Sequence, residues 1–150
     1  MANATSTPAP DAVTLEVRRT FPASRQRVFA AWTSAEALKR WFAPENATVE
    51  NAQVDFQVGG RYQVDIRAND GVLHIVVGAY REIDPPKRIV FSWRWQNHPQ
   101  ATDTLVSVEF IERDTQTEVV LTQEGLTTEQ DRAGHRHGWV GCLDKLAAIV

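Results

Sequence analysis

Hydrophobic and polar residues alternate over much of this chain, which is the pattern of β-strands with one buried face. The first such stretch covers residues 13–21 and ends at Pro22. The period of two returns later and predicts further strands at 54–58, 61–66, 72–83, 87–95, 104–111 and 118–123. Short turns join these strands in sequence, so we expect an antiparallel meander.

Turn signals mark the ends of the predicted strands. Asn69-Asp70-Gly71 is typical of a hairpin, Gly59-Gly60 supplies a turn or bulge, and Asp84-Pro85-Pro86 separates two long strands. Residues 96–103 form a polar loop before the last two strands, which Asp114-Thr115 joins. We therefore expect short connections throughout the sheet, with one longer loop.

Three other segments have the 3.6-residue period of helices. Ser24 can cap a short first helix and Ser34 a short second one, and together they make a V-shaped pair before the sheet resumes. Thr127 or Thr128 then caps a helix that continues to the C-terminus. About 22 residues at about 1.5 Å each give this helix a length of about 33 Å.

These elements predict an α+β fold, in which a curved antiparallel sheet wraps around a long C-terminal helix and two short helices follow the first strand. Residues 1–11 are small, polar and proline-containing, so we expect a disordered leader there. Residues 12–150 then form one domain, which is long enough to bury a hydrophobic core.

One face of the final helix changes character along its length. Arg132 and His135 occupy this face near the start of the helix, and apolar residues occupy the rest of it. Such a helix is expected to run from the mouth of a pocket into the core. Gly134, Gly138 and Gly141 lie beside the same face and predict a close approach of another backbone segment.

Aromatic and branched side chains of the sheet and the helices are predicted to meet on the inner face of the sheet. They supply more ring volume than contact between a sheet and a helix needs. They therefore either fill a solid core or line a cavity, and the pattern alone leaves both open. Tyr62, Tyr80 and His135 could orient a polar group of a ligand. The candidate cavity residues are Phe29, Trp41, Phe42, Tyr62, Val64, Tyr80, Phe91, Trp93, Val106, Val108, His135, Trp139 and Leu143.

The charge pattern excludes some functions. The net charge is −3 and no run of lysines or arginines exists, so the footprint of a nucleic-acid-binding protein is missing. No apolar stretch approaches the roughly 20 residues that span a bilayer, and the N-terminus does not resemble a secretory signal. The single Cys142 cannot form an internal disulfide, which fits a reducing compartment. We therefore expect a cytoplasmic protein without a nucleic-acid partner or stable membrane insertion.

Metal and covalent chemistry have little support in the sequence. His135 and His137 point about 200° apart on a helix and cannot chelate one ion, and His74 and His98 have no cluster of cysteines or carboxylates beside them. We predict no metal and no cofactor. No nucleophile elbow, phosphate loop or carboxylate pair is present, so no catalytic residue is predicted. The inward-facing His135 is interpreted as a structural histidine, with a general base as the alternative, and Cys142 as a small core residue.

Five stretches of the chain resemble one known family. They are residues 22–32, 41–42, 59–62, 82–93 and 138–146. In this order they resemble the homologues of the activator of heat-shock-protein-90 ATPase. These belong to the START-like helix-grip (SRPBCC) superfamily, which also contains polyketide cyclases and lipid-transfer proteins. The resemblance covers residues 13–150, and it implies a helix-grip fold with an internal hydrophobic cavity.

The resemblance is compatible with three hypotheses about function. We favour an intracellular domain that binds a small hydrophobic or aromatic molecule. The alternatives are an enzyme similar to polyketide cyclases and dehydratases, and a stress-response module that contacts a chaperone. Asp55-Phe56-Gln57 departs from the Asp-x-Arg sequence that the family often shows, and the separate N-terminal domain of the eukaryotic co-chaperones is expected to be replaced by the leader alone. The sequence leaves open whether the chain is a monomer or a dimer.

Overall fold

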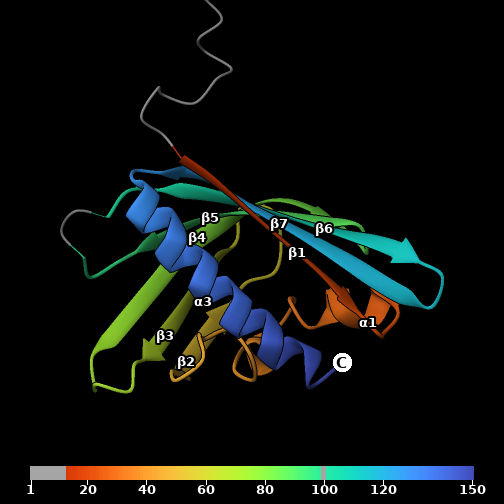
Figure 1. The fold of residues 1–150 in the computed structure, drawn as a ribbon, viewed down its shortest axis with the longest axis horizontal. Coiled ribbons are helices and arrows are strands. Elements are labelled where there is room, and N and C mark those ends of the chain that lie inside the picture. The colour runs from red at the N-terminus through yellow and green to blue at the C-terminus, as the bar shows by residue number, and fades with distance from the viewer. Residues whose placement is uncertain (1–12, 99–100) are drawn as a thin grey trace, which may run out of the picture.

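The computed structural model describes residues 13–98 and 101–150 (Figure 1). Strand β1 (Val13–Phe21) is followed by the short helices α1 (Arg25–Ala30) and α2 (Ala35–Leu38), and the chain ends with helix α3 (Glu129–Ala147). Between α2 and α3 lie β2 (Thr48–Val54), β3 (Arg61–Arg67), β4 (Leu73–Asp84), β5 (Arg88–Trp95), β6 (Thr104–Arg113) and β7 (Gln116–Leu126). The leader predicted for residues 1–11 lies outside the described residues.

The strands form one antiparallel sheet in the order β1-β7-β6-β5-β4-β3-β2. Strands β2 to β6 each pair with the next strand in sequence, as in a meander, and β7 also pairs with β1. Helix α3 lies across one face of this sheet (Figure 1). The predicted α+β fold, with a sheet that holds the C-terminal helix, is therefore confirmed.

Each helix begins at a hydroxyl side chain. Ser24 caps α1 and Ser34 caps α2, in each case by accepting a hydrogen bond from the backbone N–H three residues later. Thr128, and not Thr127, caps α3, and its Oγ1 accepts from the N–H of Asp131 at 2.9 Å. These bonds satisfy backbone donors that have no partner inside the helix. Helix α3 has 19 residues, so it is slightly shorter than expected.

The strand predicted at residues 54–58 is wrong in position. Strand β2 ends at Val54, and residues 55–60 form a tight turn. Gly59 has a φ angle of 87°, which a residue with a side chain rarely adopts. A Cβ atom at Gly60 would collide with the carbonyl oxygen of Asp55. The apolar residues of this segment therefore alternate without belonging to the sheet.

The carboxyl-terminal half of α3 is fixed to the sheet and to the loop that follows α2. Trp139 and Leu143 are buried against the sheet. Nζ of Lys145 donates hydrogen bonds to the carbonyl oxygens of Pro44 and Ala47, both at 2.8 Å. Apolar burial and these two bonds together hold this half of the helix in place.

The three glycines of α3 have different surroundings. A Cβ atom at Gly141 would lie 2.9 Å from the backbone nitrogen of Glu45, so the predicted close approach exists there. At Gly134 and Gly138 nothing outside the helix's own backbone lies within 4 Å of that position. The prediction is therefore wrong for these two glycines, which face an open space instead.

Helix α3 also covers the outer side of the edge strand β1. The guanidinium of Arg136 donates to the carbonyl oxygen of Glu16 at 2.9 Å, and that of Arg132 donates to the carbonyl oxygen of Thr14 at 3.3 Å. Both carbonyl groups belong to β1, which is an edge strand of the sheet. Side chains of α3 therefore occupy acceptors that an edge strand would otherwise expose.

Candidate ligand-binding site

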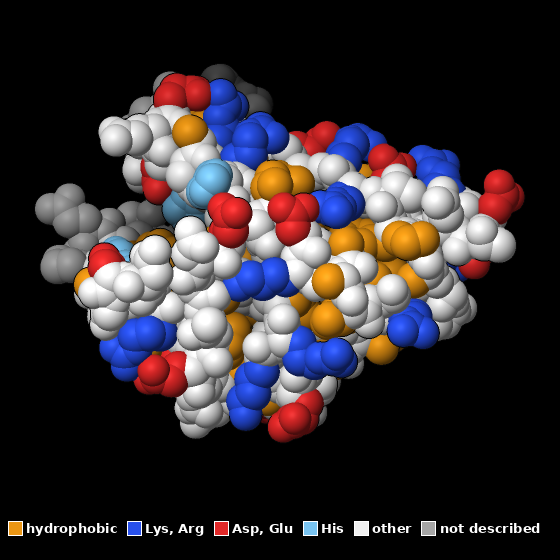
Figure 2. Space-filling view, turned by 60° about the horizontal axis from the view of Figure 1, so that its bottom comes forward, with side chains coloured by type: hydrophobic (Ala, Val, Ile, Leu, Met, Phe, Trp, Pro, Cys, Tyr) orange, Lys and Arg blue, Asp and Glu red, His pale blue; other side chains and the backbone are white. Residues whose placement is uncertain are grey.

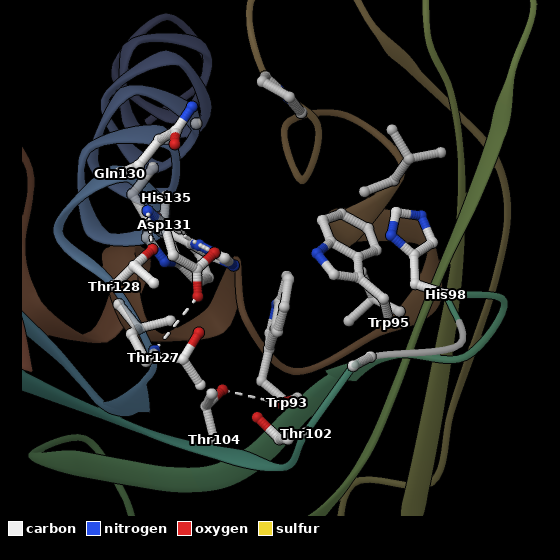
Figure 3. Close-up of a pocket in the computed structure, with 18 of the residues that line it drawn as sticks. Trp93, Trp95, His98, Thr102, Thr104, Thr127, Thr128, Gln130, Asp131 and His135 are labelled. Carbon is white, nitrogen blue, oxygen red and sulfur yellow. Dashed lines mark hydrogen bonds and ion pairs between the residues drawn. The ribbon is translucent and has the colours of Figure 1, made fainter. Parts of the chain in front are cut away.

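A cavity of about 630 Å³ lies between the amino-terminal half of α3 and the inner face of the sheet (Figure 3). Strands β3 to β7 contribute side chains to it, and the segments on either side of residues 99–100 and before α3 form part of its border. Gly134 and Gly138 line it from α3, and their missing side chains leave room for it. Small-molecule sites typically have volumes of about 300–1,000 Å³.

Aromatic rings line the apolar wall of the cavity. Trp93 and Trp95 are two residues apart on β5, with ring centroids 4.6 Å apart and ring planes at 76°. Trp139 of α3 packs edge-on against Phe42, with centroids 5.6 Å apart. His98 stacks on Trp95 with ring planes 18° apart. Rings held at different angles form a wall that fits a bulky or flat apolar group.

Polar groups gather where α3 begins (Figure 3). Nδ1 of His135 lies 2.9 Å from the backbone oxygen of Asp131 and 3.2 Å from its carboxylate Oδ1. The carboxylate also accepts a hydrogen bond from the N–H of Thr127 at 3.5 Å. Because a carbonyl oxygen is an acceptor, Nδ1 carries the hydrogen of the imidazole. Nε2 of His135 is buried without a hydrogen-bond partner among the described residues.

A buried chain of hydrogen bonds stands behind the cavity wall. Nε1 of Trp139 donates to Oε1 of Gln123 at 2.8 Å, and Nε2 of Gln123 donates to Oγ1 of Thr104 at 2.9 Å. The Thr104 hydroxyl donates in turn to the carbonyl oxygen of Trp93 at 2.7 Å. Gln123 is fully buried, and a buried amide needs partners of this kind. These three hydrogen bonds connect α3 to β7, β6 and β5 beside the cavity.

Burial changes the ionisation of three side chains near the cavity. It raises the pKa of the Cys142 thiol to about 12, so this cavity-lining group is a neutral thiol at neutral pH. Burial also raises the pKa of the Tyr62 and Tyr80 phenols above the ordinary value. The thiolate is the reactive form of cysteine, so Cys142 serves here as a small apolar wall residue.

Two histidines from different elements lie close together beside the cavity. Nδ1 of His74 lies 3.1 Å from Nε2 of His98, a contact that the sequence did not predict. Within residues 13–98 and 101–150, no three His, Cys, Asp or Glu side chains come together as a metal site requires. The His74–His98 pair therefore supports the position of the ring that stacks on Trp95.

The surface carries charges of both signs. On the face that Figure 2 shows, lysine and arginine side chains are interspersed with aspartate and glutamate side chains. In the part of the chain that the structure describes, no helix is both long enough and apolar enough to cross a membrane.

The predicted cavity residues occupy three places in the structure. Four of them line the cavity: Phe42, Trp93, His135 and Trp139. Three others border, together with Phe42, a separate void of about 10 Å³, which has room for about one water molecule: Tyr62, Tyr80 and Phe91. The remaining six are buried in the core and line neither space: Phe29, Trp41, Val64, Val106, Val108 and Leu143.

Sequence reasoning missed the polar border of the cavity, which includes Thr102, Thr104 and Asp131. The order of the strands in the predicted meander could have revealed this border. Strands β6 and β7 form a hairpin, so the end of β7 returns to the start of β6. Residues 101–103 and the start of α3 must therefore lie at the same end of the sheet, although they are far apart in sequence.

The antiparallel sheet, the long helix across it and the cavity between them define a helix-grip-like protein. Residues 22–150 match the model of the family described as "Activator of Hsp90 ATPase homolog 1-like protein". The chain therefore belongs to this family, and the resemblance noted in the sequence is confirmed.

Two curated relatives are the human and mouse proteins named "Activator of 90 kDa heat shock protein ATPase homolog 1". They are 25% and 22% identical to this chain over 126 residues, which is 83% of the chain and 33% of each relative. The chain thus spans about a third of the length of these relatives.

Solved structures similar to this chain come from several bacteria. A protein from Chromobacterium violaceum has a TM-score of 0.82 and 26% identity, and the match covers 95% of this chain and 98% of that one. An uncharacterised protein from Rhizobium leguminosarum has a TM-score of 0.79 and 28% identity, over 91% and 93% of the two chains. A family member from Silicibacter pomeroyi has a TM-score of 0.79 and 24% identity, over 91% and 96%.

Proposed function

We propose that this protein binds a small hydrophobic or aromatic molecule in the cavity beneath α3. The observation that carries the proposal is a space of about 630 Å³ that three indole rings line, those of Trp93, Trp95 and Trp139. Apolar burial stabilises a ligand by about 25 cal/mol per Å², and rings that are already in place lose little entropy on binding.

The state of the polar groups favours binding over catalysis. His135 is the candidate general base, but its Nδ1 is held by Asp131 and its Nε2 is covered. Cys142 is a neutral thiol. A cyclase or dehydratase needs a titratable group that can reach the reacting atoms. The observed arrangement instead fits a site that orients a ligand through its border and holds it through its rings.

The names of the curated relatives suggest contact with a chaperone as an alternative function. Such a contact would need an exposed binding surface. The large hydrophobic side chains that are exposed in the described residues are Val58, Val72 and Val140, and they come from two different turns and from α3. A contact surface usually contains a contiguous apolar patch. We therefore base the proposed function on the cavity. The proposal includes a soluble, cytoplasmic location.

Native mass spectrometry of protein purified from its own host tests the proposal, and a co-purified small molecule is the expected result. Titration with naphthalene-sized aromatic compounds should also quench tryptophan fluorescence, because three indoles line the space. Gly138→Leu, which fills the cavity, should abolish the quenching, whereas Gly138→Ala should retain most of it. Equal quenching in both variants, or none in the parent protein, would contradict a ligand site here.

A further inference from the structure

The charges around the cavity indicate which ligands it accepts. This inference rests on the proposed function. Among the described residues that line the cavity, Asp131 is the one acidic side chain, and there is no lysine or arginine. The other lining groups are apolar side chains, hydroxyls, amides, imidazoles and one thiol. A carboxylate without a neighbouring cation attracts positive charge and repels negative charge in a partly desolvated site.

Asp131 is placed to act on a ligand. Its side chain keeps 37% of its surface exposed. It stands on the α3 side of the cavity, and in Figure 3 Trp93 lies between it and Trp95. The carboxylate has one contact with Thr127 N–H and one with His135 Nδ1. An ionised carboxylate offers about four acceptor positions, so Asp131 retains capacity for a donor from a ligand.

The start of a helix usually favours an anion, which would argue for the opposite charge preference. Here Glu129 and Asp131 already place two carboxylates in the first turn of α3, and the Thr128 hydroxyl occupies one of the free N–H groups. Arg132 does not offset them inside the cavity, because its guanidinium pairs with Glu129 and donates to the carbonyl of Thr14 on β1. The positive end of the helix is therefore already compensated.

The tryptophans of the cavity also favour a positively charged ligand. An organic cation is attracted to the face of an aromatic ring, and most strongly to that of tryptophan. Trp93 and Trp95 are in edge-to-face contact, with ring planes at 76°, and both line the cavity. Trp95 is held by the stacked His98, and Trp93 packs edge-on against His135 at 5.0 Å. Since His135 contacts both Trp93 and Asp131, a cationic head beside Trp93 also lies near the carboxylate.

We propose that the cavity selects aromatic organic cations, such as arylmethyl ammonium compounds, over neutral and anionic compounds of the same size. The cationic head lies near the carboxylate of Asp131 and the indole of Trp93. The apolar body extends toward Trp139 and Phe42. Aromatic carboxylates and fatty acids are disfavoured, because no lysine or arginine of the described lining compensates their charge.

Three probes with the same ring test this selectivity by calorimetric titration of the full chain at mildly alkaline pH. They are (2-naphthylmethyl)trimethylammonium, 2-naphthylmethanol and 2-naphthylacetate. The ammonium compound is expected to bind about tenfold more tightly than the alcohol, and the acetate about tenfold more weakly. The permanent charge of the quaternary ammonium keeps the result independent of the ligand's own protonation.

Two variants with the same change of charge distinguish an effect of charge in the cavity from an effect of charge elsewhere on the helix. Asp131→Asn retains an acceptor for Thr127 but removes the charge that faces the cavity. Glu129→Gln removes a charge from the same helical turn at a side chain that is 73% exposed and does not line the cavity. Asp131→Asn should weaken ammonium binding about fivefold and leave the alcohol within about twofold, whereas Glu129→Gln should change neither appreciably.

Each outcome decides between the proposals. If the alcohol binds but the ammonium compound binds no better, or if the acetate is preferred, the charge selectivity is wrong and ligand binding stands. If both variants weaken the ammonium compound equally, the effect is a general one of net charge and the role of Asp131 is wrong. If none of the three probes binds to the parent protein, the proposed function itself fails.

Discussion

Gln123 is the side chain on which the geometry of the cavity wall depends most directly. It is fully buried, and it joins Trp139 on α3 to Thr104 on β6. The amide is the right length to reach both partners and has both a donor and an acceptor. An apolar residue of similar size would leave the indole N–H of Trp139 without its partner.

Gln123→Leu is therefore expected to lower the free energy of unfolding by about 1–3 kcal/mol, since a buried donor becomes unsatisfied. It should also weaken ligand binding, because Trp139 is no longer held by its N–H. Urea denaturation measures the first effect and fluorescence titration the second. Gln116→Leu, the same change at an exposed position of β7, serves as the control. Equal stability of the two variants would show that the buried bonds contribute nothing.

Cys142 gives a second prediction for a single residue. Burial raises the pKa of its thiol to about 12, from an ordinary value near 9. The unfolded chain loses this proton at lower pH than the folded chain does. The contribution of Cys142 to stability is therefore complete below about pH 9 and is lost progressively between about pH 9 and pH 12. Denaturation midpoints measured across this range should fall more steeply for the parent protein than for Cys142→Ala.

The same burial predicts slow chemical modification. A thiol reagent applied near neutral pH should label Cys142 at a rate close to that of unfolding, and rapidly in denaturant, because the thiolate is the reacting form. Occupation of the cavity should slow the labelling further, since Cys142 is part of its lining. Rapid labelling of the folded protein would contradict the buried position.

At the scale of elements, α3 consists of two halves with different tasks. The carboxyl-terminal half is packed against the sheet and bonded to the loop after α2 through Lys145. The amino-terminal half borders the cavity and carries Gly134 and Gly138 on that side. Stability is concentrated in one half of the helix, and the room for a ligand in the other.

Replacement of each of the three glycines by alanine should change stability in opposite directions in the two halves of α3. Gly134→Ala and Gly138→Ala should each raise the free energy of unfolding by up to about 1 kcal/mol, because alanine favours the helix and its methyl group enters open space. Gly141→Ala should lower it, since the methyl group would lie 2.9 Å from the backbone nitrogen of Glu45. Thermal unfolding of the three variants measures this, and stabilisation by all three would overturn the assignment.

The sequence predicted elements well where local rules apply. Alternation placed β1 and β3 to β7 to within a few residues, and hydroxyl caps placed the three helix starts. Alternation failed at residues 54–58, because β2 ends at Val54 and the chain turns before β3 begins. The surroundings of Gly134, Gly138 and Gly141 could not be told apart either. They depend on which part of the chain lies opposite, and that is set by the tertiary arrangement.

At the scale of the whole molecule, the cavity should appear in the pattern of amide hydrogen exchange. Strands β5 to β7 and the carboxyl-terminal half of α3 surround the core and should exchange slowly. The amino-terminal half of α3 should exchange faster, because it faces the cavity on one side. Addition of an aromatic ligand should slow exchange in this half selectively. Uniform slowing over the molecule would indicate global stabilisation instead.

The candidate site was only partly predictable, and the reason concerns the packing of the whole molecule. The inward direction of Trp93, His135 and Trp139 follows from strand and helix periods, and all three line the cavity. Periods do not show where packing is complete and where a space remains. The same periods directed Val106 and Val108 inward, and both are fully buried in the core away from the cavity.

The cover over β1 has a consequence for how copies of this protein can assemble. Growth of a fibre by strand addition needs two open edges on every molecule, one to receive a neighbour and one to offer to the next. Arg132 and Arg136 occupy two backbone acceptors of the edge strand β1, so a strand that adds to this part of the edge must first displace both side chains. We therefore expect fibre growth through this part of β1 to be disfavoured.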